Sequence, residues 1–289
     1  MLALIVIANL VVIFTKASAC GTRVSEVLEL APTVTDPGGE PVSIQAKEDT
    51  PKVSFQNVSF SYGGAQENAL EQIELHVRRG ETVGVIGGTG SGKSTLVNLI
   101  PRFYDATAGQ VMVDGVPVTD YPFFQLRGQI GVVPQQAVLF AGTLRENMQW
   151  RKRDASDEEI SRALEIAQAA EFVSKLPEGL DTMIQQGGRN LSGGQRQRLT
   201  IARALVGTPQ ILILDDSASA LDFATDAALR KALRQQTRDM TVLWCRSGRG
   251  PSVRLTVSSC LTMAELSVLG RIASCLRHAR FIGRYASLR

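Results

Sequence analysis

A glycine-rich segment of nine residues, at positions 87–95, constrains the fold of this chain more than any other part of the sequence. It follows a short apolar run, ETVGVIG, and leads into STLVNLIPRFY, which has the apolar spacing of a helix. A turn between them needs glycine, because a Cβ would stop successive backbone N–H groups from pointing at one bound anion. The sequence therefore predicts a strand, a phosphate-binding loop and a helix. The loop consists of Gly87, Gly88, Thr89, Gly90, Ser91, Gly92, Lys93, Ser94 and Thr95.

Two side chains of this loop and one later strand have complementary chemistry. At the spacing GxxxxGK[ST], Lys93 can reach the β- and γ-phosphates of a nucleoside triphosphate, and the Ser94 hydroxyl can ligate Mg²⁺. Residues 210–216, QILILDD, form an apolar run that ends in two carboxylates. A buried strand with this sequence would deliver Asp215 to the metal, which it can hold through water. The two motifs together predict a P-loop nucleoside triphosphatase.

A third motif narrows the family. In NLSGGQRQRLTIARAL, Leu191 is followed by Ser192, Gly193, Gly194 and Gln195 and then by a basic helical segment. With this signature the chain resembles the ABC ATPases over about residues 52–243, and GTLRENM at 142–148 is similar to the exporters among them. The resemblance implies an α/β fold for a nucleotide-binding domain over residues 51–243. Its parts would be a P-loop core with a mixed sheet, a small antiparallel β-subdomain around the first strand, and a helical subdomain near 140–190.

The same resemblance assigns further site residues and the cofactors ATP and Mg²⁺. Tyr62 matches the aromatic residue that stacks on adenine, and Gln135 matches the glutamine that senses the γ-phosphate and metal. Ser94, Gln135 and Asp215 would be the metal ligands, and Lys93, Gln135 and Asp216 the catalytic group. ATP would be bound between two subunits, by the phosphate loop of one and residues 192–195 of the other. Residues 219–222, SALD, match the loop that lies between the two sites.

The N-terminal fifty residues divide into an apolar run, a polar helical pattern and a segment rich in proline, glycine and charge. Residues 1–15 are too few to cross a bilayer alone, which takes roughly 20. A signal peptide, a lipoprotein signal around Cys20 and the end of a longer transmembrane helix are the three readings. Exporters have a membrane domain before the ATPase, so the resemblance favours the third. Residues 1–30 would then end the last membrane helix and extend it into the cytoplasm, and 31–50 would be a linker.

This organisation implies partners and a location. The chain would lie at the cytoplasmic face of the cell's inner membrane, with its own or a partner's transmembrane domain and a second ABC subunit. Nucleic acid is not an expected partner, because the basic excess is confined to residues 244–289, which carry eight arginines and one acid. The rest of the chain is net acidic. The four cysteines form no CxxC pair or disulfide framework, which favours a reducing compartment.

Asp216 stands where the family usually has the glutamate that polarises the attacking water. Its carboxylate lies about 1.5 Å further back, because aspartate is one methylene shorter. Gln186 also replaces an acid that is common in exporters. In heterodimeric exporters one subunit often has such a weakened site and a good signature. We therefore expect this chain's own loop mainly to bind ATP, while Ser192 and Gly194 complete a hydrolytic site on a partner subunit.

The sequence departs from the family again at residue 244. There it lacks the usual switch histidine and its composition changes, and His278 has no matching context. A natural extension and a shifted reading frame are the two explanations. If each codon takes the last base of one triplet and two of the next, residues 243–248 can encode Val-Val-Ser-Gln-Arg. Residues 261–264 can likewise encode Asp-Asp-Gly, and 269–275 Gly-Thr-His-Arg-Glu-Leu. All three match the family in order, so residues 244–289 are expected to pack poorly.

Two other interpretations compete with an exporter subunit. A soluble ABC ATPase of translation or DNA repair would usually carry two such domains or long coiled coils, and would lack the apolar N-terminal run. The product could also be a non-functional, truncated remnant of a gene. The transported substrate is not encoded in these residues, since the membrane helices choose it.

Overall fold

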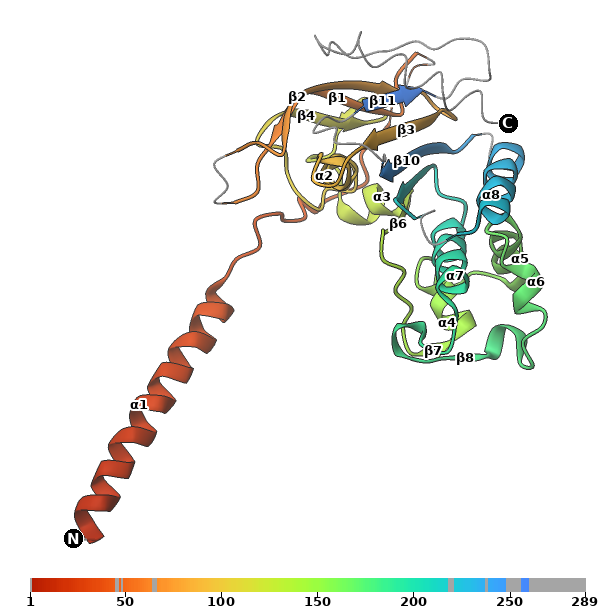
Figure 1. The fold of residues 1–289 in the computed structure, drawn as a ribbon. Helices are drawn as coiled ribbons and strands as arrows, with labels where there is room; N and C mark the ends of the chain where they lie inside the picture. The colour runs from red at the N-terminus through yellow and green to blue at the C-terminus, as the bar shows by residue number, and fades with distance from the viewer. Residues whose placement is uncertain are drawn as a thin grey trace. The chain divides into compact units, whose positions relative to one another are not determined.

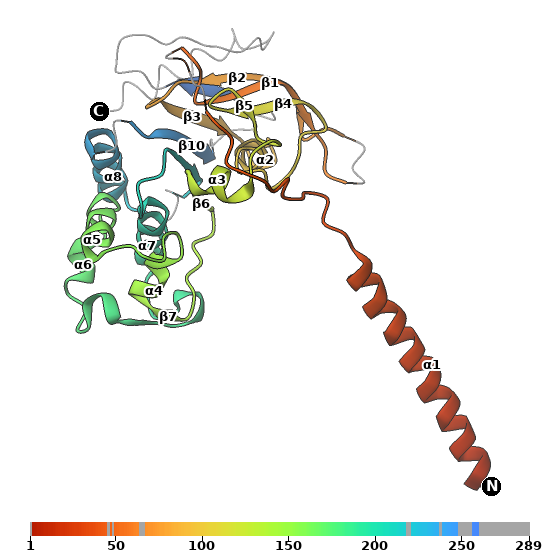
Figure 2. The ribbon, with the colours of Figure 1, turned by 180° about the vertical axis from the view of Figure 1, so that it is seen from behind.

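The computed structural model describes residues 2–44, 47, 49–63, 67–217, 221–236, 239–247 and 256–259. The chain divides into two compact units, residues 1–35 and 36–289. Within the second unit, two sheets lie together and a group of helices forms a separate lobe (Figure 1). Figure 2 shows the same division from behind. The expected α/β fold with antiparallel and helical subdomains is confirmed.

The first unit is one continuous helix, α1, which spans Leu2–Glu29. Its 28 residues correspond to about 42 Å of helix. The apolar and polar parts of the N-terminal pattern thus lie in one helix without a break between them. None of its residues is buried. Leu2–Leu28 is the one described helix that is long and apolar enough to cross a membrane by length and composition, with a mean hydropathy of 2.1.

An antiparallel sheet begins the second unit. Its strands are β1 (Val53–Phe60), β2 (Leu70–Val77), β4 (Ala108–Val113) and β5 (Val116–Pro117), in the order β2-β1-β4-β5. The apolar side chains Val53, Phe55, Val58 and Phe60 of β1 are buried, while Gln56 and Asn57 are exposed. This is the small antiparallel subdomain that the resemblance implied around the first strand.

A second sheet holds β3 (Thr82–Gly87), β6 (Ile130–Val133), β9 (Ile211–Asp215), β10 (Thr241–Ser247) and β11 (Thr256–Ser259). The order is β11-β3-β10-β9-β6, and only β11 runs antiparallel to its neighbour. Helices α2 (Lys93–Leu99) and α3 (Phe123–Gly128) accompany it, and one apolar core joins the inner side chains of both sheets to those of α2. Strands buried on both faces explain the continuous apolar run of residues 211–214.

The helical lobe contains α4 (Leu144–Gln149), α5 (Asp157–Ile166), α6 (Ala170–Val173) and α7 (Gly193–Leu205). It also contains β7 (Gly142–Thr143), β8 (Met183–Ile184) and two 3₁₀ turns at 179–181 and 186–188, and α8 (Phe223–Gln236) packs beside α5. Ser156 caps α5: its hydroxyl accepts from the Glu159 N–H, and the Glu159 carboxylate accepts from the Ser156 N–H. This lobe has its own apolar core.

Arg151 connects the helical lobe to the parallel sheet. Its guanidinium donates to the carbonyl oxygens of Ile130, Val206 and Gly128 at 2.6, 2.8 and 2.9 Å. These carbonyls lie at the ends of β6, α7 and α3, where backbone acceptors lack partners within their own element. Burial lowers the pKa of Arg151 from its usual value. Arg151 therefore holds the ends of β6, α7 and α3 together.

Lys52 connects the two sheets. Its ammonium donates to Asp114 Oδ2 at 2.7 Å, to Gln129 Oε1 at 2.9 Å and to Gln210 Oε1 at 2.5 Å, which uses all three N–H groups. Lys52 and Asp114 are each 2% exposed, and Arg79 also bonds to Asp114. Burial lowers the pKa of Lys52, while the bond to Asp114 acts in the opposite direction. A charge buried this deeply is tolerated because every donor has an acceptor.

Two expected boundaries shift. The expected linker, residues 31–50, is docked in part, because Asp36 accepts from the Phe123 N–H and Val42 exchanges two hydrogen bonds with Gln125. The expectation of poor packing from residue 244 is wrong for residues 244–247. These residues complete β10, in which Trp244 and Cys245 are buried, and β11 pairs with β3. Residues 248–255 and 260–289 lie outside the described part of the chain.

Replacing Lys52 by methionine should lower the free energy of unfolding by about 3–5 kcal/mol, because it leaves the Asp114 carboxylate buried with one partner fewer. Urea unfolding of the chain in detergent, followed by circular dichroism, measures the change. Lys175→Met is the matched control, since the Lys175–Glu171 pair is exposed and should contribute little. Equal unfolding midpoints for the two variants would show that the Lys52 network does not stabilise the junction of the sheets.

Candidate functional site

The parallel strands place three predicted motifs at one edge of the sheet. Because β3, β10, β9 and β6 run in the same direction, their carboxyl ends meet there. Gly87 is opposite Ser247, and Asp215 is opposite Cys245. Val133, two residues before Gln135, is opposite Leu214. The phosphate loop, the two aspartates and Gln135 therefore follow strands at the same edge, where ligands bind in open α/β sheets.

Gly92 has a conformation that its surroundings require. Its φ is 85°, and a Cβ at this position would lie 2.7 Å from the Ala69 carbonyl oxygen and 2.9 Å from a Leu70 methyl group. Glycine is therefore needed both for the backbone angle and for the close approach of β2. Gly92 also starts α2, because its carbonyl accepts from the Leu96 N–H at 2.8 Å. The loop expected from the sequence is formed at residues 87–92.

The Lys93 ammonium lies inside this loop. It donates to the carbonyl oxygens of Gly87 at 3.0 Å and Gly88 at 2.7 Å, and to Ser91 Oγ at 3.4 Å. Lys93 is 7% exposed, and no carboxylate among the described residues forms an ion pair with it. At Gly90, φ is 79° and nothing lies within 4 Å of where a Cβ would be. A buried cation that is held by carbonyl oxygens within a glycine-rich loop fits the phosphates of a nucleotide.

Asp215 and Asp216 lie at the end of β9 in different backbone conformations. Asp215 ends the strand, whereas Asp216 has a φ of 45° and donates its N–H to the Cys245 carbonyl oxygen at 3.2 Å. A left-handed φ at a non-glycine residue stores backbone strain, which functional sites often do. Burial raises the pKa of the neighbouring Cys245 thiol, and the charge of Asp215 adds to this shift. The thiol therefore stays protonated beside the two acids.

Tyr62 reaches the phosphate loop from the antiparallel sheet. Its hydroxyl lies 2.9 Å from Thr95 Oγ1, and 41% of its surface is exposed. Its ring also contacts the rings of Phe60 and Tyr104, neither of which we predicted to be near the site. An aromatic residue at position 104 has no separate signal in the sequence, because YD after a helix is also typical of an ordinary turn.

The signature residues start α7 in the helical lobe. Ser192 Oγ accepts from the Gln195 N–H at 3.2 Å, and Gln195 Oε1 accepts from the Ser192 N–H at 2.9 Å. This reciprocal pair orders the first turn, with Gly193 exposed and nothing within 4 Å of a Cβ built on it. In the described part of the chain, no hydrogen bond joins residues 192–195 to residues 87–95. Ser219 and Ala220 of the SALD segment lie outside the described residues.

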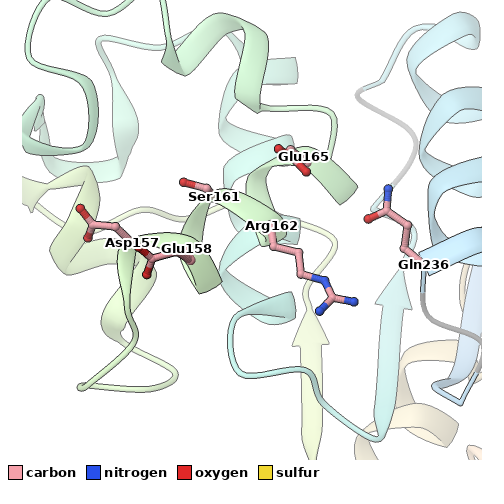
Figure 3. Close-up of a pocket in the computed structure, with 6 residues that line it drawn as sticks. All are labelled: Asp157, Glu158, Ser161, Arg162, Glu165 and Gln236. Atoms are coloured by element: carbon pink, nitrogen blue, oxygen red, sulfur yellow. The ribbon is translucent and has the colours of Figure 1, made fainter.

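A separate surface pocket of 510 Å³ lies between α5 and α8 (Figure 3). None of the predicted site residues lines it. Its carboxylates would repel a polyphosphate, so it is not a candidate for the nucleotide. The lining residues are Asp157, Glu158, Ser161, Arg162, Glu165 and Gln236.

Comparisons with known proteins agree with this geometry. The family described as ABC transporter matches residues 70–219. The chain is 46% identical over 224 residues to the uncharacterized ABC transporter ATP-binding protein YfiB of Bacillus subtilis strain 168, covering 78% of this chain and 38% of YfiB. It is also 46% identical over 192 residues to an ATP-dependent lipid A-core flippase of Chromobacterium violaceum, covering 66% of this chain and 33% of the flippase.

A solved structure shows the same arrangement. A bacterial Atm1-family ABC exporter with ATP bound matches with a TM-score of 0.71 and 32% identity, over 80% of this chain and 40% of that one. The chain thus spans less than half the length of these relatives. With a phosphate loop, a strand that ends in Asp215 and a capped signature helix in one domain, the chain belongs to the ABC transporter family and carries its ATP-binding domain.

Proposed function

We propose that this chain is the ATP-binding part of an ABC exporter and drives export of a substrate across a membrane as one half of a dimer. The observation that carries the proposal is the buried Lys93 ammonium, held by loop carbonyls at the sheet edge where Asp215 ends its strand. The names of its relatives support export, since several are called multidrug export ATP-binding/permease proteins. Whole exporters of this kind are longer than this chain.

Residues at the sheet edge would hold ATP with Mg²⁺. The amides of residues 87–95 would bind the phosphates, Lys93 the β- and γ-phosphates, and Tyr62 would stack on the base. Ser94, Gln135 and Asp215 offer a hydroxyl, an amide and a carboxylate, the oxygen ligands that Mg²⁺ prefers. The metal would neutralise charge on the phosphates.

Hydrolysis would transfer the γ-phosphoryl group to water. The bond between the γ-phosphorus and the bridging oxygen breaks as the water oxygen attacks, giving ADP and phosphate. Asp216 is the group that would orient this water. A displacement of about 1 Å can cost roughly 100-fold in rate, so a carboxylate that lies about 1.5 Å back makes this site slow. The site would therefore bind ATP longer than it hydrolyses it.

The exposed start of α7 would serve the partner's nucleotide. Ser192 and Gln195 satisfy each other's backbone, which leaves the exposed Gly193 turn available to a second subunit. A heterodimer gives each subunit a role, because this chain supplies an intact signature and the partner supplies a catalytic glutamate. Gln135 would connect nucleotide binding to the membrane domain.

Helix α1 would anchor the domain to the membrane. It is long and apolar enough to span, and its polar C-terminal part would extend into the cytoplasm. The ATP-binding domain would then lie at the cytoplasmic face of the inner membrane, where ATP is available. A membrane-anchored domain of this kind is expected of an exporter and not of a soluble ABC ATPase.

Replacing Lys93 by alanine should weaken ATP binding about 10- to 100-fold, because a charge-assisted contact to the phosphates is lost. Binding of a fluorescent ATP analogue to the purified chain in detergent measures this. Lys175→Ala, an exposed lysine of the helical lobe, is the matched control and should bind like the wild type. Equal affinity of the Lys93→Ala variant would exclude the loop as the nucleotide site.

Replacing Asp216 by glutamate should raise ATP hydrolysis by roughly 10- to 100-fold in the chain purified as a homodimer, by moving the carboxylate forward. Phosphate release measures the rate, and Asp216→Asn should stay at or below the wild-type rate. A wild-type homodimer that already hydrolyses ATP at tens per second, on the order of typical enzymes, would contradict the weakened site.

We also propose that residues 244–289 result from a shifted reading frame. The nucleotide sequence across codons 240–247 should contain an inserted or deleted base relative to related genes. Restoring the frame should recover the arginine-containing segment Val-Val-Ser-Gln-Arg in place of residues 243–248, at the end of β10. An unbroken homologous tail in related genes would contradict the shift.

A further inference from the structure

Tyr62 is held in place by side chains rather than by its own backbone. It lies two residues beyond the end of β1, and its backbone forms no hydrogen bond within the described part of the chain. The last backbone anchor before it is the Ser61 N–H, which donates to Thr107 Oγ1 at 3.1 Å. Whatever fixes the Tyr62 ring therefore acts on the ring itself.

Tyr62 belongs to a closed cluster of three aromatic rings, with Phe60 and Tyr104. The centroid of Tyr62 lies 4.9 Å from that of Phe60 and 5.4 Å from that of Tyr104, with interplanar angles of 85° and 86°. Phe60 and Tyr104 also contact each other, at 5.5 Å. Near-perpendicular rings at these distances attract through their quadrupoles as well as by dispersion. At its other end, the Tyr62 hydroxyl meets Thr95 in the phosphate loop.

The backbone that precedes Tyr104 is held by hydrogen bonds. The preceding residues turn sharply after α2, with Arg102 at a φ of 54° and the Phe103 N–H bonded to the Asn98 carbonyl oxygen. Arg127 of α3 donates to the carbonyl oxygens of Pro101 at 3.1 Å and Arg102 at 3.0 Å. The backbone that leads into Tyr104 is therefore fixed by charge-assisted bonds, unlike that of Tyr62.

The Arg102 side chain also fixes the residue that follows Tyr104. Its guanidinium donates to both carboxylate oxygens of Asp105, at 2.7 and 3.2 Å, and to the Thr119 carbonyl oxygen at 3.2 Å. Arg102 is 7% exposed, whereas the Asp105 side chain is 35% exposed, so these bonds are shielded from water on the arginine side only. Tyr104 thus lies between Arg102 and Asp105, which are bonded to each other, and Arg102 is also bonded to Thr119 and Arg127.

We propose that Tyr104 is a positioning residue for base recognition: it holds the Tyr62 ring at the angle at which a base can stack on it. The inference rests on the proposed ATP site. Tyr62 keeps an exposed surface while two rings, each nearly perpendicular to its own, pack against it, so its position is set before the base arrives. Supporting a contact residue in this way reduces the ordering cost of binding.

Binding of the base and binding of the phosphates should depend on different residues. Lys93 and the loop amides bind phosphate whether or not Tyr62 is held, whereas stacking needs the ring in place. Losing one perpendicular ring contact should therefore weaken ATP binding about three- to tenfold and leave the binding of a base-free triphosphate unchanged. Phe60 is a poor test of this idea, because it is 4% exposed and belongs to the core. Tyr104 is 39% exposed and can be replaced without opening a cavity.

The experiment measures binding of ATP and of inorganic tripolyphosphate, each with Mg²⁺, to the full chain purified in detergent. Calorimetry would compare the wild type with Tyr104→Ala, Tyr104→Phe, Tyr62→Ala and the double alanine variant. Tyr104→Ala should lose ATP affinity and keep tripolyphosphate affinity. Tyr104→Phe should match the wild type, because the Tyr104 hydroxyl has no hydrogen bond among the described residues. The double variant should bind ATP no more weakly than Tyr62→Ala, since the two rings act through one contact.

The outcomes separate this inference from the proposed function. A wild-type chain that binds neither ligand would overturn the proposed ATP site itself. If the wild type binds both ligands, then wild-type ATP affinity in Tyr104→Ala would overturn the role of Tyr104. So would an equal loss of both ligands in that variant, because the damage would then lie in the phosphate loop. Additive losses in the double variant would show that Tyr104 does not act through Tyr62.

Discussion

The site depends on one constraint, the parallel pairing of β3, β10, β9 and β6. Parallel strands bring their carboxyl ends to one edge, and the register fixes which residues meet: Gly87 faces Ser247, and Asp215 faces Cys245. A shift of one residue in either pairing would turn the side chains to the opposite face. The phosphate loop and the two aspartates are at least 120 residues apart in the chain, and the pairing of these strands makes them neighbours.

The sequence was sufficient for the parts of the fold that depend on local chemistry. The phosphate loop and the strand that ends in Asp215 each follow from a few adjacent residues whose types the geometry requires. Side-chain networks between distant segments could not be predicted. Lys52 binds acceptors 62, 77 and 158 residues away, and no pattern in the sequence indicates that those acceptors converge. The ring contact between Tyr62 and Tyr104 is of the same kind.

If the ATP site is shared between two subunits as proposed, each half is ordered without the other. The first turn of α7 is satisfied by its own Ser192 and Gln195, so it needs no nucleotide to form. The phosphate loop is likewise ordered by Lys93, which bonds to loop carbonyls. Each half thus exists in advance, and closing a dimer around ATP would cost little local ordering. Arg151 keeps the lobe attached to the sheet during such a movement.

The central position of β10 has a consequence for how such a gene can change. A strand paired on both sides receives its hydrogen bonds from β3 and β9, and these bonds involve the backbone alone. The space between the two neighbours therefore selects for apolar bulk rather than for particular side chains, and Trp244 and Cys245 meet that condition. The pairing with β3 and β9 therefore tolerates a changed amino-acid sequence in β10. If the proposed frame shift is real, it has changed the side chains of β10 and left the pairing of the strand intact, so a change of sequence here need not prevent folding.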